Sequence, residues 1–502
     1  MDEKPNSKNN GQMAFPPGPD EIIPYHLALK FISNPIPILM EIANKYGDIS
    51  HFKFGPTLHV YLVNNAYHIE NILVKHNSNF IKSPGLRLAK RVLGNGLLTN
   101  EGSAHKIQRQ LVQPAFSRSR VKIYGKIILE HCLEYVDSTW KDSMVLDIHK
   151  EMTNMTISII SKILFGTNNL AISDIDKISN SITIIIEYIN KLRLPFLRFI
   201  EVLPLPLTIR YRQALRSLDK LIYAKIEERK ETAESRPSNE SNSLPGGTNE
   251  SQNTGYFDML SILIKSSDIK ITENNDESKT NNDKAAKMTN QQLRDEVMTI
   301  FLAGHETTAN ALTWTFYLLS QHPQVESKII GEIASVFGNE GNIDDNGDRM
   351  ATFEDISKLK YTEMVLMESM RLYPPSWAIG RQAIKDYALD SRYVIPSGSV
   401  IIMSQYLMHH DSRYFSQPWR FYPERWSTEF RSSIPRFSYF PFGGGPRSCI
   451  GEPLAWTEGI VILATILRKW KITLEENAQN VKLQPIATLR PKNGIRMKLH
   501  KR

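Results

Sequence analysis

Cysteine is scarce in this sequence, and its scarcity excludes several classes of protein. The 502 residues include only two cysteines, Cys132 and Cys449. Two thiols cannot build the disulfide framework of a secreted protein of this length or the cysteine set of an iron–sulfur cluster, and they fit a reducing compartment. We therefore expect a cytoplasmic protein without an iron–sulfur cluster of its own.

Long apolar runs are missing as well. No window supplies the roughly 18 to 20 uninterrupted apolar residues that a transmembrane helix needs. The nearest candidate, Ser181 to Leu207, is broken by charged residues such as Glu187 and Lys191. It fits either a pair of buried or amphipathic helices or a flexible apolar lid over a pocket. Residues 1–14 are polar, without the apolar core of a signal peptide, and predict a disordered N-terminal tail.

The charge pattern argues against nucleic acid as a partner. The net charge is +8, which alone would permit an acidic partner of several kinds. However, Lys and Arg are interspersed with Asp and Glu, and the chain has no long basic run and no zinc-finger spacing. This pattern is typical of a solvated mixed-charge surface, so we expect no binding to nucleic acid.

The spacing of apolar residues is mostly helical. It dominates between about residues 106 and 230. Strand-like runs are few, and two of them, Ile49–Phe54 and His59–Val63, predict a hairpin around Gly55. The fold class expected is therefore mainly α (α+β).

Two polar segments interrupt this pattern, at about residues 231–256 and 266–287. They cannot bury enough apolar surface to offset the entropy lost on ordering. We predict that they are disordered insertions at the surface of a single domain over residues 15–502, which begins at the turn-rich segment Phe15–Pro19.

Cys449 has surroundings that are unusual for a lone cysteine. It lies in the glycine-dense loop Phe442-Gly-Gly-Gly-Pro-Arg-Ser-Cys-Ile-Gly451, just before a predicted helix over Pro453–Lys469. A lone cysteine is usually an inert small hydrophobic residue. Here the glycines allow backbone N–H groups to turn toward the sulfur, and the N-terminus of the next helix favours an anion. The site therefore suits a thiolate.

This loop resembles the Phe-x-x-Gly-x-Arg-x-Cys-x-Gly signature of the cytochrome P-450 family, in which a thiolate binds haem iron. The five fixed positions are matched by Phe442, Gly445, Arg447, Cys449 and Gly451. The resemblance implies a soluble prokaryotic-type member with a large helical region around haem b (iron protoporphyrin IX) and a small β-rich region near the N-terminus. Cys449 would be the metal ligand, and Phe442 and Gly445 would contact the cofactor.

A long helix is predicted before this loop. Thr289 and Gln292 have the spacing of a capping box, and His322 and Pro323 end the helix after about thirty residues. Its middle, Ala303-Gly-His-Glu-Thr-Thr308, is polar within an apolar run. One interpretation is that Gly304 packs at a helix crossing and Glu306 lies at the surface. The other is that Gly304 and the threonines loosen the helix and open space for dioxygen.

The same segment is similar to the family's Ala-Gly-x-Glu-Thr-Thr motif. That similarity implies that Glu306 and Thr307 are catalytic residues: the alcohol would relay protons toward the haem and the acid would recharge the relay. Ala303 would contact the cofactor.

Two further patterns resemble family features. Glu368 and Arg371 stand three apart on a predicted helix and, with Arg425, imply a buried structural network; alone, such a pair is usually exposed. Donors to the two haem propionates would be His105, Arg109, Arg381 and Arg447.

The function implied is a haem-dependent monooxygenase that inserts one atom of dioxygen into a lipophilic organic substrate. The sequence has no Gly-x-Gly-x-x-Gly fingerprint after a strand, so the electrons would come from a separate ferredoxin or flavodoxin-type donor with its reductase. We expect a monomer. Two rivals stay open: a haem-thiolate peroxygenase or isomerase that needs no reductase, and a haem-based gas sensor without turnover.

The substrate class is indicated only by apolar side chains. By resemblance to family regions that face the haem, candidates for the pocket are Leu97, Leu98, Ala303, Trp377, Ala378 and Ile379, each of which could equally be ordinary core. They indicate a lipophilic molecule such as a fatty acid, a terpenoid or a steroid-like compound.

Overall fold

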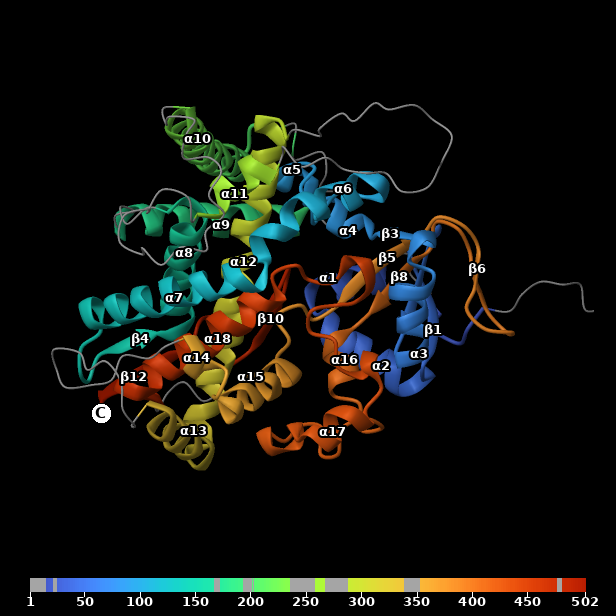
Figure 1. The fold of residues 1–502 in the computed structure, drawn as a ribbon. Coiled ribbons are helices and arrows are strands. Elements are labelled where there is room, and N and C mark those ends of the chain that lie inside the picture. Colours follow the sequence, from blue (N-terminus) through green and yellow to red (C-terminus); the bar gives the residue numbers. More distant parts are fainter. Residues whose placement is uncertain are drawn as a thin grey trace, which may run out of the picture. The chain divides into compact units, whose positions relative to one another are not determined.

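The computed structural model describes residues 15–20, 25–166, 172–192, 201, 203–234, 258–266, 288–337, 353–475 and 481–502. The chain divides into two units, each assembled from separate stretches of sequence (Figure 1). The first unit comprises Met1–Leu86, Ala378–Pro418 and Pro435–Ser448. The second comprises Arg87–Trp377, Trp419–Ile434 and Cys449–Arg502.

A five-stranded sheet organises the first unit, with strand order β1-β2-β8-β5-β3. Its strands are β1 (Ile49–Phe54), β2 (Leu58–Val63), β3 (Phe80–Lys82), β5 (Ile379–Ala383) and β8 (Val400–Met403). The predicted hairpin is present, since β1 and β2 pair antiparallel and Gly55 takes a positive φ at the turn. β8 lies parallel to β2. The expectation that the β-rich region lies near the N-terminus therefore holds for β1, β2 and β3. A late part of the chain completes the sheet with β5 and β8.

The core of the first unit follows from strand alternation. Tyr61 and Val63 on β2, and Ile401 and Met403 on β8, are fully buried and stand two apart, so they share one face of the sheet. The remaining elements of this unit are α1 (His26–Ser33), α2 (Pro35–Tyr46), α3 (Ala66–Glu70), α16 (Gln405–His409) and the hairpin of β6 (Tyr387–Ala388) and β7 (Val394–Ile395). α4 (Pro84–Arg87) contains the point in the sequence where the first unit's first stretch ends, at Leu86.

The second unit is mostly helical, as predicted (Figure 1). Its helices are α5 (Lys90–Leu93), α6 (Gly102–Val112), α7 (Arg118–Thr139), α8 (Ile148–Phe165), α9 (Ile172–Lys191), α10 (Pro206–Glu234), α11 (Met259–Ser266), α12 (Asn290–Gln321), α13 (Pro323–Phe337), α14 (Phe353–Ile356), α15 (Lys360–Leu372), α17 (Thr428–Ser433) and α18 (Glu452–Lys469). Its strands are β4 (Val145–Asp147), β9 (Trp470–Leu474), β10 (Leu483–Pro485), β11 (Leu489–Pro491) and β12 (Arg496–Lys501). The four strands after α18 were not anticipated.

α12 is the long helix that the sequence predicts. The capping box is formed, because the Thr289 hydroxyl accepts from the backbone N–H of Gln292 while the Gln292 side chain accepts from the N–H of Thr289. The helix runs for 32 residues, about 48 Å at 1.5 Å per residue, and α8 packs beside it in Figure 1. It is α-helical without interruption. A Cβ on Gly304 would approach Ile160 of α8 to 3.3 Å, which supports the packing interpretation of this glycine.

Several expectations concern residues at the edge of the described ranges. α10 extends through Glu234, into the start of the predicted 231–256 insertion, and α11 ends at Ser266. The rest of both insertions and the tail of residues 1–14 lie outside the described residues. The described parts of the Ser181–Leu207 segment belong mainly to α9 and the start of α10. Over the ranges given above, no helix combines the length and the apolar character needed to cross a membrane.

A buried ion network joins α15 to the segment that follows Trp419. Arg371 donates from Nε to Glu368 Oε2 at 2.9 Å and from Nη2 to Oε1 at 3.0 Å. Arg425 adds a bond from Nε to Oε1, also at 3.0 Å. Trp426, a partner that the sequence did not indicate, donates from its indole N–H to Oε2 at 2.9 Å. Glu368 and Arg371 have no exposed surface, so the predicted network is confirmed and is buried.

A second buried carboxyl group lies where α18 crosses α12. Glu458 of α18 is buried, and its hydrogen-bond partner is the Thr308 side chain of α12. Burial raises the pKa of Glu458 to about 8, and its hydrogen bond with the Thr308 side chain opposes this rise only in part. The neutral acid is therefore the form that the folded protein favours at neutral pH.

Glu368→Gln should lower the free energy of unfolding by about 3–5 kcal/mol, because Arg371 and Arg425 would keep their buried charges without a full counterion. Urea unfolding at neutral pH measures this. The matched control is Glu363→Gln on the same helix, whose partly exposed pairs with Lys360 and Arg431 should contribute no more than about 1 kcal/mol. Equal losses in the two variants would contradict a special role for Glu368.

Glu458→Gln should remove part of the pH dependence of stability. In the unfolded chain this carboxyl group ionises near its ordinary value of 4.5, whereas in the folded protein it stays protonated up to about 8. The wild type therefore loses stability as the pH rises through that window, and the loss is complete above about 8. Urea unfolding at pH 5 and pH 9 should show a smaller difference for Glu458→Gln than for the wild type. An identical difference would mean that Glu458 ionises normally when folded.

Candidate functional site

The loop before Cys449 depends on glycine. Gly443 and Gly445 have φ values of +70° and +71°, a region that L side chains rarely adopt. A Cβ on Gly445 would also lie 2.1 Å from the backbone oxygen of Leu73. Another residue at position 445 would therefore both strain the backbone and displace the neighbouring chain, which explains this fixed glycine of the motif.

Cys449 is the first residue of the second unit's last segment, just before α18. Its side chain is exposed, although enough protein surrounds the sulfur for burial to raise the pKa of the thiol. Backbone N–H groups of Gly451 and Glu452 bond to the sulfur and act in the opposite direction, as does the charge of Arg109. An accessible sulfur with two N–H donors and a nearby cation is a suitable donor for a metal that needs one protein thiolate.

The residues of this site fit haem better than a metal held by several side chains. Within the described parts of the chain, no group of three or more His, Cys, Asp or Glu side chains is arranged to hold a metal ion. Haem iron needs only one protein ligand on the thiolate side, because the porphyrin supplies the rest. Cys132, the other cysteine, is fully buried in α7 next to Met155 and belongs to the core.

The four predicted propionate donors divide between the two units. His105 is buried on α6, and Arg109, one turn later on the same face, lies near enough to Cys449 to affect its pKa. Arg381 is buried on β5 of the first unit, and Arg447 lies in the short turn of helix at Gly445–Arg447. The structure thus brings Arg109 and Cys449 together within the second unit. Arg381 and Arg447 belong to the first unit.

The middle of α12 presents its side chains in two directions. Ala303 is exposed and Thr307 is partly exposed, and the Thr307 hydroxyl donates to the backbone oxygen of Ala303 at 2.8 Å. Glu306 is only 7% exposed, so the interpretation that places it at the surface is wrong. Thr308 is buried and bonds to the backbone oxygen of Gly304 at 3.2 Å, on the side toward Glu458. Thr307 is therefore the accessible alcohol of the pair.

Glu306 has a counterion that the sequence did not reveal. Nε and Nη2 of Arg490 lie 2.8 Å and 2.7 Å from Oε1 of Glu306, and the Thr488 hydroxyl donates to the same oxygen. Both partners come from the end of the hairpin formed by β10 and β11. Arg490 lies on β11 and Thr488 in the turn just before it, in a part of the sequence where no strand was predicted. Pairing them with Glu306 required the fold, because about 180 residues separate them in the sequence.

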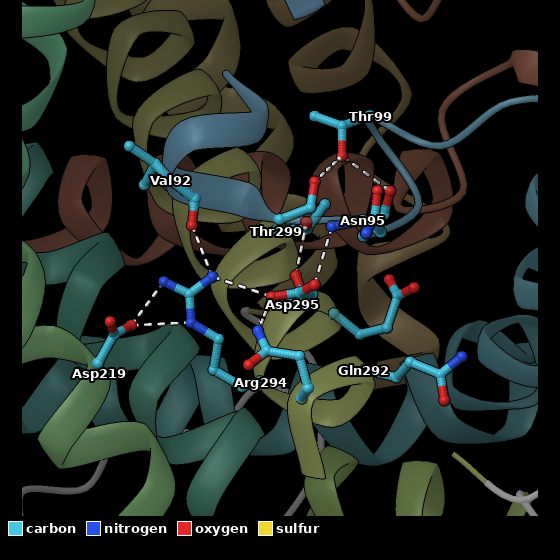
Figure 2. Close-up of polar contacts among 12 residues, drawn as sticks. Val92, Asn95, Thr99, Asp219, Gln292, Arg294, Asp295 and Thr299 are labelled. Carbon is cyan, nitrogen blue, oxygen red and sulfur yellow. Dashed lines mark hydrogen bonds and ion pairs between the residues drawn. The ribbon is translucent and has the colours of Figure 1, made fainter. Parts of the chain in front are cut away.

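The first turns of α12 form a second polar cluster, which Figure 2 shows in close-up. Arg294 donates to Asp219 of α10 from Nε at 2.8 Å and to the backbone oxygen of Val92 at 2.6 Å. Asp295 accepts from the backbone N–H of Asn95 at 2.8 Å. The cluster therefore fastens α10 and the loop after α5 to α12 (Figure 2).

The predicted pocket residues also belong partly to the second unit and partly to the first. The backbone N–H of Leu97 donates to the Glu296 carboxylate of α12 at 3.0 Å, so this residue is held against the helix that carries Ala303. Trp377 is buried, and its indole N–H donates to the backbone oxygen of Ile486 at 3.2 Å. Leu98 is 39% exposed. Ala378 and Ile379 belong to the first unit.

Comparison with known proteins gives a consistent result. The family model for cytochrome P450 matches residues 16–499. Cyclooctatin synthase of Streptomyces melanosporofaciens is 31% identical over 89% of this chain and 87% of its own length. Pentalenene oxygenase of Streptomyces avermitilis is 27% identical over 92% of both chains.

Solved structures agree with the sequence comparison. The structure of retinoic acid-bound cyanobacterial CYP120A1 matches with a TM-score of 0.78 at 22% identity, over 98% of this chain and 100% of that chain. The heme domain of cytochrome P450DA matches with a TM-score of 0.77 at 20% identity, over 98% of each chain. The expected fold is therefore confirmed, and the chain belongs to the cytochrome P450 family as a haem-dependent monooxygenase.

Proposed function

We propose that Cys449 is the thiolate ligand of the haem iron. The observation that carries this proposal is the exposed residue Cys449, whose sulfur accepts from two backbone N–H groups and lies near the charge of Arg109. Haem b, when bound there, supplies the activation of dioxygen, to which an electron-donating thiolate contributes. Cys449 would supply negative charge to the iron, and the N–H donors of Gly451 and Glu452 would moderate the charge on its sulfur.

The remaining cofactor contacts follow from charge and from size. Arg109, Arg381 and Arg447 would bind and neutralise the two propionates, because guanidinium groups form charge-assisted bonds with carboxylates, and His105 would be a further hydrogen-bond donor. Phe442 and Gly445 would contact the porphyrin. Ala303, an exposed residue of α12 with a small side chain, would contact it as well.

Glu306 and Thr307 are proposed to deliver protons. Thr307 has the accessible hydroxyl, and its bond to the Ala303 backbone oxygen turns the hydroxyl along the helix. When the hydroxyl turns away from the Ala303 oxygen, Thr307 can pass on its proton while its oxygen takes up another from water. Glu306, the preceding residue, would take up protons from solvent and release them to recharge the relay.

The proposed substrate is a lipophilic organic molecule. The apolar side chains of Leu97, Leu98 and Trp377 support this class, with Ala378 and Ile379 as further candidates. The names of two relatives include cyclooctat-9-en-7-ol and pentalenene, and one similar structure holds retinoic acid. Spectral titration of the purified protein with fatty acids, terpenoids and steroid-like compounds tests the proposal; no change in haem absorption with any lipophilic compound would reject it.

Electrons are proposed to come from a ferredoxin or flavodoxin-type protein with its reductase. A net charge of +8 suits an acidic donor, and added salt should then raise the KM for that donor. We also propose that the protein is a cytoplasmic monomer, which light scattering and cell fractionation test.

Cys449→Ser should abolish the thiolate character of the haem spectrum, because a neutral alcohol cannot donate charge to iron as a thiolate does. The measurement is the absorption spectrum of the reduced, haem-loaded protein with carbon monoxide. Cys132→Ala is the control, since that buried thiol lies in the core of α7, and it should keep the wild-type spectrum. A carbon monoxide adduct of the wild type resembling that of histidine-ligated globins would reject the proposed function.

Thr307→Ala should retain haem but divert electrons from product to peroxide, because the relay loses its hydroxyl. Removal of a proton-transferring group costs roughly 10²–10⁴-fold in the step that it serves. The ratio of product to NADPH consumed, with a substrate found by titration, measures the effect. Thr313→Ala is the matched control: its hydroxyl makes the same bond one turn back, to the Ala309 oxygen at 2.6 Å, and this variant should couple normally. Normal coupling in Thr307→Ala would remove Thr307 from the relay.

A further inference from the structure

The hairpin of β10 and β11 supplies both groups that bind the Glu306 carboxylate. The side chains of Arg490 and Glu306 are 14% and 9% exposed, so the ion pair is largely shielded from water. Both Arg490 contacts and the bond from Thr488 reach Oε1. An oxygen that already accepts from a guanidinium and a hydroxyl is a poor site for another proton, so a proton taken up by this carboxyl group goes to Oε2.

The direction of the bond from Thr488 is fixed by its neighbours. Nε2 of His149 lies 3.2 Å from Oδ1 of Asn310, and Nδ2 of Asn310 donates to the Thr488 hydroxyl oxygen at 3.1 Å. A hydroxyl group has one proton to donate. Because Asn310 already donates into the Thr488 oxygen, the Thr488 proton points to Glu306. Since an amide group does not pass protons on readily, this chain orients Glu306 and is not itself a proton path.

Arg490 is the cation that compensates Glu306. Three titratable groups face the carboxylate: Arg490 from β11, His149 from α8 and His305 from α12 itself. Burial lowers the pKa of His149, and the charge of Arg490 lowers it further. Burial likewise lowers the pKa of His305. Both imidazoles are therefore neutral at neutral pH, and Arg490 provides the compensating charge.

The hairpin is itself anchored on both sides. The backbone N–H of Leu489 donates to the Pro375 oxygen at 2.9 Å, and the Leu489 oxygen accepts from the Trp314 indole at 2.9 Å. At the turn, the Ile486 oxygen accepts from the Trp377 indole. These bonds limit the movement of Thr488 and Arg490, which is what a positioning role requires.

We propose that Arg490 and Thr488 are positioning residues that compensate the charge of Glu306 and turn its carboxylate so that Oε2 is the oxygen that takes up and releases the proton. This inference rests on the proposed role of Glu306 and deepens it. Nothing in the sequence pattern around Glu306 predicts the pairing, which depends on a hairpin near the C-terminal end of the chain.

Infrared spectroscopy tests the charge of Glu306 without turnover. The stretch of protonated Glu306 is assigned by its loss when Glu306→Gln is added to the same variant, which separates it from the stretch of the protonated Glu458. The Glu306 band should be absent from the wild type at pH 7 and present in Arg490→Gln. A buried carboxylate without a cation takes up a proton instead of staying charged. Arg490→Lys keeps a cation and should resemble the wild type. Absence of the band in Arg490→Gln would overturn the proposal.

The matched control is Arg496→Gln on β12. Arg496 forms an exposed pair with Glu475 at 2.7 Å, outside the network, and its side chain is 67% exposed. This variant should show neither the infrared band nor any change in coupling. The same change in Arg496→Gln as in Arg490→Gln would overturn the proposal, because it would show a general effect of lost charge.

Coupling of NADPH use to product gives the second readout. Arg490→Gln should lose roughly tenfold, less than the 10²–10⁴-fold expected when a proton-transferring group itself is removed. Thr488→Val, which keeps the shape of the side chain and the charge of Arg490, should lose less, and Thr488→Ser should restore coupling. Normal coupling in both Arg490→Gln and Thr488→Val would overturn the proposal. Thr488→Val decides the question if Arg490→Gln does not fold.

The two proposals fail in different ways. If Glu306→Gln couples normally, Glu306 does not deliver protons. The proposal that Arg490 positions Glu306 for proton delivery is then rejected as well. If Glu306→Gln is impaired while both hairpin variants couple normally, only the positioning proposal is overturned. The carbon monoxide spectrum, which tests Cys449, is independent of both outcomes.

Discussion

A helix that crosses a protein core can carry polar side chains only if each of them finds a partner there, and α12 is subject to this constraint along most of its 32 residues. Its threonines meet it locally, because hydroxyls such as those of Thr307 and Thr313 donate to the backbone oxygen one turn back. Its buried side chains Arg294, Glu306 and Asn310 are bound in another way. They must reach other elements, and each such bond fixes one element relative to the helix.

Two polar clusters on α12 hold different parts of the protein. At the start of α12, Arg294 and Asp295 hold α10 and the loop that contains Leu97 (Figure 2). In the middle, Glu306 and Asn310 hold the hairpin of β10 and β11. The first cluster secures candidate walls of the substrate pocket, and the second secures the acid of the proposed proton relay. One helix thus relates the two to each other.

The thiolate loop meets a different constraint, that of backbone shape. Gly445 is required both by its positive φ and by the Leu73 oxygen that a Cβ would meet.

Glu368 is a buried acid outside α12 that also needs partners, and two arginines and an indole bind its carboxylate. Glu458 instead remains protonated. Glu368 and Glu306 are thus paired with arginine and Glu458 is kept neutral, which are two ways to avoid an uncompensated buried charge.

Patterns within a short stretch of sequence determined much of this protein. The capping box at Thr289, the hairpin around Gly55 and the loop that ends in Cys449 each depend on residues a few positions apart, and local backbone geometry translates such spacing directly into structure. The pair of Glu368 and Arg371 belongs to the same class, although the indole of Trp426 that completes it does not. Only the tertiary structure decided that Glu306 is buried, that Arg490 and Thr488 bind it, and that Thr307 and not Thr308 is accessible. Burial and ion pairing depend on which surfaces meet after the chain has folded, and segments about 180 residues apart carry no local signal of that meeting.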